Sequence, residues 1–232
     1  MNQEKKILIF DIDGVLVDVS NSYREAIKQT AEFYTNTKVT PKEIQSYKEK
    51  TGFNNDWDLT YAIIQSRGRG VLKEKVIEKF QELYLGVDKK KGFIENEKWL
   101  LNKKVLDYLS KKYLIGILTG RPKEEAFIAL DKEGFRRYFG VIIAMEDCEG
   151  KGKPNPFGLF LALEKLGYPN SKNAIYVGDS LDDIRAAKNA GIRSIGCLPP
   201  KNKSNKLKQL MFSFGAFRVI KEVNEIEKGE LF

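Results

Sequence analysis

Short runs of apolar residues alternate along most of the chain with segments of helical periodicity. The first run, Ile7–Phe10, has four consecutive apolar side chains, the pattern of a strand that is buried on both faces. Similar runs predict strands at residues 113–118, 141–144, 174–177, 192–195 and 217–220, the last of them at a sheet edge. Between them, helices are predicted at residues 102–110, 122–134, 156–166, 181–190 and 206–214. This alternation predicts an α/β fold, with a Rossmann-like, doubly wound parallel sheet.

Residues 18–100 follow a different pattern, in which no segment alternates as a strand does. Helices are predicted from a cap at Ser20 or Asn21 to about residue 34, from Pro41, from a cap at Asn55 or Asp56 to about residue 65, and over residues 71–85. A direct crossover between neighbouring parallel strands needs only roughly 30 residues. We therefore predict a core domain of residues 1–17 and 101–232, interrupted by a helical domain of residues 18–100.

Polar residues stand at the ends of the predicted strands. Asp11 and Asp13 follow the first strand, Thr119 follows the second, and Asp179 follows a later one. Right-handed crossovers bring these ends to one edge of the sheet, which is where ligands bind in open α/β folds. Because a carboxylate is costly to bury without a partner, a cation or hydrogen-bond donors must lie close to Asp11 and Asp13. These residues favour a metal-assisted phosphoryl-transfer site.

Composition narrows the alternatives. The chain has 232 residues, 42% hydrophobic and 31% charged, which is typical of a globular protein, and no apolar run approaches a membrane span. The N-terminal residues do not resemble a signal peptide, and two cysteines make no disulfide framework, so we expect a cytoplasmic protein. The net charge of +8 comes from scattered lysines, which indicates a solvated surface and not a nucleic-acid site. The absence of histidine excludes every histidine-based triad or metal site.

Four short motifs, taken in order, resemble those of the haloacid dehalogenase (HAD) superfamily of phosphatases. They are Asp11-Ile12-Asp13-Gly14-Val15-Leu16-Val17-Asp18, Leu118-Thr119-Gly120-Arg121, Gly152-Lys153-Pro154-Asn155-Pro156 and Gly178-Asp179-Ser180-Leu181-Asp182-Asp183. The helical insertion resembles the C1-type cap of subfamily IA, and the chain as a whole is similar to phosphoglycolate phosphatases. The insertion also shares a faint similarity with a branch whose members are named in connection with histidine biosynthesis.

The resemblance implies a role for each carboxylate. Asp11 is expected to attack the phosphoryl group and form an aspartyl-phosphate. Asp13 is expected to protonate the leaving group and then to deprotonate the attacking water. Mg2+ is the implied cofactor, bound by Asp11, by Asp179, by the backbone carbonyl of Asp13 and, directly or in its outer shell, by Asp183.

The remaining motif residues are expected to hold the phosphoryl group. Thr119 and the Gly120 N–H would bind its oxygens, Arg121 belongs to the same substrate-binding group, and Lys153 would neutralise developing charge. Lys151 is a rival for the role of Lys153. Asp182 is interpreted as a first-turn acid that stabilises the helix dipole, whereas the spacing from Asp179 favours Asp183 as the functional residue. The segment 150–153 lacks the pattern of a P-loop.

Substrate choice is expected to lie in the cap, which closes over small substrates and excludes water. The residues considered as substrate contacts, each with a competing surface or packing role, are Arg24, Lys50, Asn54, Asn55, Trp57 and Arg121.

The predicted activity is that of a Mg2+-dependent phosphatase that acts on a small, soluble phosphomonoester. The alternatives are a phosphomutase of the same fold, similar to β-phosphoglucomutase, and a non-catalytic regulatory or binding protein. Dehalogenation and phosphonate cleavage are disfavoured by Asp13. The expected partner is a small phosphorylated metabolite, with no nucleic acid and no membrane, and the chain is expected to be a monomer or a homodimer.

Overall fold

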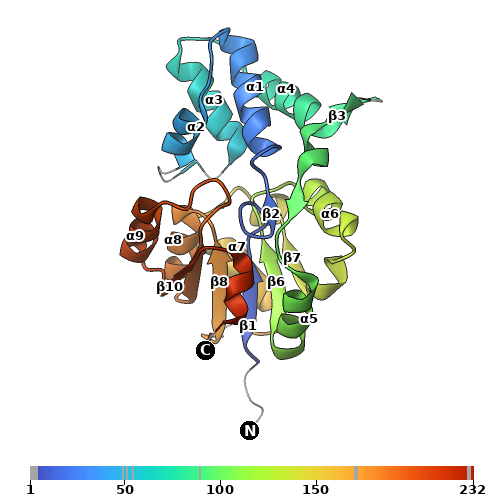
Figure 1. Ribbon diagram of the computed structural model, residues 1–232, viewed down its shortest axis with the longest axis vertical. Helices are drawn as coiled ribbons and strands as arrows, with labels where there is room; N and C mark the ends of the chain where they lie inside the picture. The colour runs from blue at the N-terminus through green and yellow to red at the C-terminus, as the bar shows by residue number, and fades with distance from the viewer. Residues whose placement is uncertain are drawn as a thin grey trace. The chain divides into compact units, whose positions relative to one another are not determined.

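The chain divides into two compact units in the computed structural model, Met1–Asp18 with Trp99–Phe232, and Val19–Lys98. We call them the core unit and the inserted unit (Figure 1). The structure describes residues 5–48, 50, 52–53, 55–88, 90–169, 172–228 and 231–232.

A six-stranded parallel sheet forms the centre of the core unit, in the order β10-β9-β8-β1-β6-β7 (Figure 1). Its strands are β1 (Ile7–Phe10), β6 (Leu114–Leu118), β7 (Val141–Ile143), β8 (Ala174–Gly178), β9 (Arg193–Cys197) and β10 (Arg218–Ile220). Strand β1 lies between β6 and β8, and Phe10 is in register with Ile117 on one side and Val177 on the other. All four residues of β1 are buried, so the prediction of a strand covered on both faces is confirmed.

Helices cover the sheet, and the predicted α/β fold is confirmed. The core helices are α5 (Lys103–Lys112), α6 (Lys123–Lys132), α7 (Phe157–Lys165), α8 (Leu181–Asn189) and α9 (Asn205–Phe214), with short 3-10 helices η2 (Arg136–Tyr138), η3 (Glu146–Cys148) and η4 (Val223–Glu227). On one face, Ile7, Ile9 and Tyr176 pack with Leu159 of α7 and Ala187 of α8 in one hydrophobic cluster. Packing on this face therefore places the start of α8 and the loop before α7 near the same end of strands β1 and β8.

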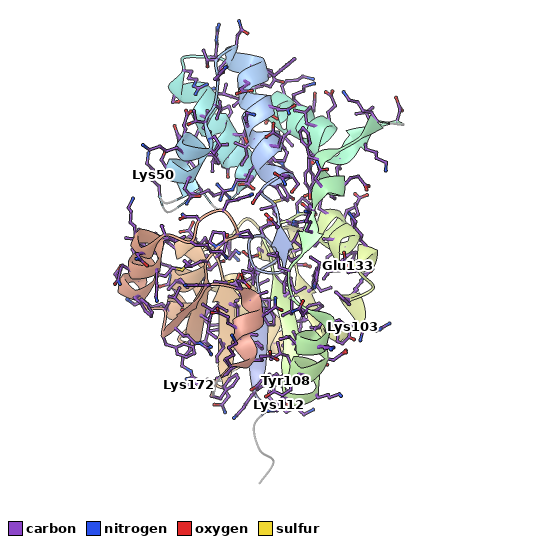
Figure 2. The ribbon with its side chains drawn as sticks, in the orientation of Figure 1. Lys50, Lys103, Tyr108, Lys112, Glu133 and Lys172 are labelled. Carbon is purple, nitrogen blue, oxygen red and sulfur yellow. The ribbon has the colours of Figure 1, made fainter. Side chains whose placement is uncertain are left out.

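Some of the lysines lie where core helices end. Lysines occupy the last turns of α5, α6, α7 and α8, where they interact favourably with the helix dipoles. Helix α5 also carries Lys103 in its first turn, ion-paired to Asp107, and the Lys112 ammonium lies 4.3 Å from the centre of the Tyr108 ring (Figure 2). These arrangements agree with a solvated basic surface.

The inserted unit is mainly helical, with α1 (Tyr23–Thr35), α2 (Pro41–Lys48), α3 (Asp56–Ser66) and α4 (Lys73–Leu85), and the 3-10 helix η1 (Phe93–Asn96). Its own hydrophobic cluster includes Ile27, Ile63 and Phe80. Asn55 caps α3, because its side chain accepts hydrogen bonds from the N–H groups of Trp57 and Asp58. Among the described residues, no helix of either unit has the length and apolarity that a membrane span requires.

Two local predictions for this segment were wrong. It contains two short strands, β3 (Gly86–Val87) and β4 (Lys90–Lys91), which pair with each other, and at its two ends β2 (Val17–Asp18) pairs with β5 (Lys98–Trp99). Two-residue strands are too short for an alternating pattern to be visible. The residue before α1 is Ser22, not Ser20 or Asn21, and its hydroxyl donates to buried Glu97 at 2.8 Å instead of capping the helix.

Candidate active site

Three carboxylates come together at the carboxyl edge of the sheet. Asp11 follows β1, Asp179 follows β8, and Asp183 lies in the first turn of α8, and one oxygen of each lies within 4.8 Å of the others. We call these residues the acidic trio. Asp11 and Asp183 are buried, and Asp179 is half-buried. The sequence motifs that lie far apart in the chain therefore meet at one place.

Two glycines allow this close approach. Gly14 has a φ of +71°, and a Cβ there would lie 2.0 Å from Asp179 Oδ2. At Gly178, a Cβ would lie 2.2 Å from the Cβ of Asp183. Any larger residue at either position would displace a member of the acidic trio.

Lys153 joins two members of the trio. Its ammonium lies 2.8 Å from Asp11 Oδ2 and 2.7 Å from Asp183 Oδ1, and its side chain is 3% exposed. The neighbouring Lys151 instead pairs with Glu149 at the surface. Of the two candidate lysines, Lys153 is thus the one that the structure brings to the acidic residues.

The carboxylates at the start of α8 differ in their surroundings. Asp183 Oδ2 accepts hydrogen bonds from the Ser180 N–H at 2.9 Å and from its hydroxyl at 2.7 Å, in a capping box. Burial raises the pKa of Asp183, but Lys153 and the Ser180 hydrogen bonds outweigh it, so that this pKa lies below its usual value. Asp182 is buried outside the trio.

Asp13 points to a different partner. Its Oδ1 accepts a hydrogen bond of 2.7 Å from Nε of Arg121, whose side chain is fully buried. Asp13 is therefore no member of the acidic trio, and the metal contact predicted for it is through its backbone carbonyl. Arg121, a predicted phosphate or substrate ligand, is ion-paired with Asp13 in this structure.

Thr119 and Gly120 lie where β6 ends, at the same edge as the trio. Thr119 is buried, its N–H donates to the carbonyl of Ile143, and its hydroxyl accepts from the Arg121 N–H at 3.2 Å. These hydrogen bonds fix the backbone of the turn, and from this turn the Arg121 side chain reaches Asp13.

The donor set of the acidic trio fits a hard divalent cation. Carboxylate oxygens are the ligands that Mg2+ and Ca2+ prefer, and the site has three carboxylates but only one ammonium, which contacts two of them. Burial raises the pKa of Asp11 to about 7, with Asp183 and Asp13 adding to the increase, despite the neighbouring Lys153. The raised pKa means that keeping Asp11 ionised costs free energy, and a bound cation would offset that cost. The trio is therefore able to bind a metal.

Replacing Gly14 with alanine is expected to weaken metal binding by about tenfold or more, because the new Cβ would push Asp179 aside. Calorimetric titration with Mg2+ measures the change. Gly191→Ala is the matched control, because Gly191 has the same φ of +71° and a Cβ there would meet no atom within 4 Å. Gly191→Ala should lose about 1 kcal/mol of stability from the left-handed backbone alone, and Gly14→Ala should lose more because of its clash with Asp179. Equal Mg2+ affinity in the two variants would contradict the expectation.

Sequence reasoning missed two residues at this site. Ser180 stands three positions before Asp183, and this spacing is the signature of a capping box, which would have revealed it. Tyr176 lies in β8 and appears in the sequence as an ordinary core aromatic. Its hydroxyl, however, is buried beside Lys153 and Asp183, at 3.0 Å from each. Because a buried tyrosine hydroxyl needs a hydrogen-bond partner, a tyrosine in a strand predicted to be covered on both faces indicates a polar group close by.

The predicted substrate contacts in the inserted unit have local roles. Asn55 caps α3, Trp57 packs against the unit's hydrophobic cluster, and the Lys50 ammonium lies 4.8 Å from the centre of the Tyr47 ring. Arg24 is half-buried in α1. Asn54 lies outside the described residues.

Known proteins resemble this chain over most of its length. An imidazoleglycerol-phosphate dehydratase from Phytophthora nicotianae is 35% identical over 206 residues, which are 86% of this chain and 45% of that protein, so the chain spans less than half of this relative. A phosphoglycolate phosphatase from Vibrio parahaemolyticus is 29% identical over 196 residues, or 84% of each chain. The crystal structure of CbbY from Rhodobacter sphaeroides in complex with phosphate has the same fold, with a TM-score of 0.75, 18% identity and 96% of each chain covered.

The family assignment rests on the match of residues 8–197 to the family described as haloacid dehalogenase-like hydrolase. This range begins within β1 and ends with β9, so it contains the acidic trio, Lys153 and the inserted unit. The chain belongs to the haloacid dehalogenase-like hydrolase family.

Proposed function

We propose that this protein is a Mg2+-dependent phosphatase that hydrolyses a small phosphomonoester through an aspartyl-phosphate on Asp11. The observation that carries the proposal is the acidic trio with Lys153 inserted between two of its members. This arrangement offers a nucleophilic carboxylate, ligands for a hard cation and an ammonium in one site. The names of similar proteins, which include phosphoglycolate phosphatases, support the same class of substrate.

Asp11 is the proposed nucleophile. Its Oδ1 accepts a hydrogen bond of 2.7 Å from the Ile12 N–H, which leaves Oδ2, the oxygen beside Lys153, to attack phosphorus. Mg2+ bound by Asp11 and Asp179, with Asp183 and the Asp13 carbonyl as further ligands, would reduce the repulsion between the carboxylate and an anionic ester. The phosphorus–oxygen bond to Asp11 forms as the bond to the leaving alcohol breaks.

Asp13 is the proposed general acid and base. Arg121 holds Oδ1, so Oδ2 is the oxygen that delivers a proton to the leaving alcohol. The same oxygen then takes a proton from the water that attacks the aspartyl-phosphate. The buried guanidinium fixes the direction of the carboxyl group throughout both steps.

Thr119, Gly120 and Lys153 are the proposed phosphoryl-binding groups. The Thr119 hydroxyl and the Gly120 N–H come from the turn after β6, and the Lys153 ammonium lies beside the attacking oxygen of Asp11. Such fixed donors stabilise the charge that develops on the transferring group.

The inserted unit, Val19–Lys98, is proposed to act as a cap that selects the substrate. A cytoplasmic location is also part of the proposal, since Cys148 and Cys197 are buried and form no disulfide, as suits a reducing compartment. The chain is proposed to work as a monomer or homodimer.

A panel of phosphorylated metabolites, assayed for phosphate release, tests the proposed function. At least one small phosphomonoester should be hydrolysed, activity should disappear with EDTA, and excess Mg2+ should restore it. Sugar phosphates are also examined for isomerisation, which would indicate a phosphomutase. Hydrolysis that is unchanged by EDTA, or no turnover of any compound, would count against the proposal.

A further inference from the structure

The hydroxyl of Tyr176 lies at the meeting point of three motifs. It is within 3.0 Å of Lys153 Nζ, 3.0 Å of Asp183 Oδ1 and 3.1 Å of the Leu118 carbonyl oxygen. Leu118 ends β6 directly before Thr119, so these contacts come from three separate segments of the chain. Tyr176 itself is fully buried in β8, with its ring in the hydrophobic cluster under α7 and α8.

The direction of one of these bonds is fixed, because the Lys153 ammonium can only donate to the Tyr176 oxygen. The Lys153 ammonium has three N–H groups and three acceptors, namely Asp11 Oδ2, Asp183 Oδ1 and the Tyr176 oxygen. Only the tyrosine is a neutral acceptor that lies outside the acidic trio. The hydroxyl has a single proton to donate, which goes either to Asp183 Oδ1 or to the Leu118 carbonyl.

The two oxygens of Asp183 are held by different residues. Ser180 binds Oδ2, whereas Tyr176 and Lys153 contact Oδ1. Residues that orient a ligating carboxylate usually contribute strongly to metal affinity although they do not contact the metal. A buried hydroxyl is costly to keep without partners, and two of the three partners of this one, Lys153 and Asp183, belong to the site.

We propose that Tyr176 is a positioning residue, whose hydroxyl anchors the Lys153 ammonium from the core side and orients Asp183 for the metal. This proposal rests on the proposed function of the trio as a metal site. Without the hydroxyl, Lys153 keeps only the two carboxylates as acceptors and competes more directly with a cation for them. The Asp183 carboxylate is then held through Ser180 and Lys153 alone.

Tyr176→Phe tests the proposal, because it removes the hydroxyl and keeps the ring that packs under α7 and α8. Calorimetric titration with Mg2+ alone, without substrate, should give a Kd about tenfold weaker than that of the parent. With p-nitrophenyl phosphate, kcat should fall by about 10–100-fold, while KM changes less than kcat and the melting temperature stays close to the parent value. Tyr168→Phe is the control, because Tyr168 packs against the same hydrophobic cluster.

A folded Tyr176→Phe protein whose Mg2+ Kd stays within about twofold of the parent value would overturn the proposal, whatever its activity. If this variant is not recovered in folded form, Tyr176→Met provides the same measurement with a more adaptable side chain. The proposed function can fail separately. If the parent protein binds Mg2+ but hydrolyses no phosphomonoester, the proposed function fails. The Mg2+ affinities of the parent and of Tyr176→Phe would still test the role of Tyr176.

Discussion

Asp11→Asn should abolish turnover, with a loss in kcat on the order of 10⁴-fold or more, since the proposed nucleophile is gone. The amide is nearly the same size as the carboxylate, so the packing around β1 is preserved. It is a poor nucleophile, however, and it also removes a negative ligand from the acidic trio. Steady-state assays with the best substrate of the metabolite panel, at saturating Mg2+, measure the loss.

Asp147→Asn is the matched control for this prediction. Asp147 also has a lysine partner, with Lys123 Nζ at 2.9 Å, but it lies outside the acidic trio. Its replacement should change kcat little. Asp11→Asn protein with parental activity would show that another group attacks the substrate.

Asp13→Asn should lower kcat by about 10²–10⁴-fold, the usual contribution of general acid–base catalysis. The expected loss depends on the leaving group. An alkyl ester needs a proton on its departing oxygen, whereas p-nitrophenolate departs without one. With p-nitrophenyl phosphate, the variant should therefore release a burst of nitrophenolate and then slow down, because the water that attacks the aspartyl-phosphate lacks its base.

Asp131→Asn is the control for Asp13, because Asp131 also pairs with an arginine, Arg136 at 3.2 Å, at the surface. It should show parental kinetics with both esters. An equal loss for alkyl and nitrophenyl esters in Asp13→Asn, without a burst, would contradict the assignment of both proton transfers to Asp13.

The fold was largely predictable because its signals are local. The apolar run at Ile7–Phe10 and the similar runs that follow along the chain predict the strands of the parallel sheet. Their alternation with helical segments predicts the helices that cover it. The same reasoning placed polar residues at the strand ends, and the structure brings Asp11, Asp179 and Asp183 together there. Strands as short as Gly86–Val87 carry no such pattern, and they were missed.

Contacts within the site were less predictable, because they join residues that are distant in sequence. The pairing of Asp13 with Arg121 depends on the geometry of the turn after β6, and no local pattern announces it. Tyr176 has the same appearance in the sequence as any aromatic in a buried strand. Only the packing of β8 against the loop that carries Lys153 shows that its hydroxyl faces the site.

Acid-quenched mass spectrometry tests the central claim, a covalent phosphoryl group on Asp11, most directly. Asp13→Asn protein is mixed with p-nitrophenyl phosphate and Mg2+, quenched during the burst and digested with trypsin. The peptide of residues 7–24, which contains Asp11, should gain the mass of one phosphoryl group, and hydroxylamine should remove it. Nitrophenolate release without this gain, or a phosphoryl group on another peptide, would contradict the account.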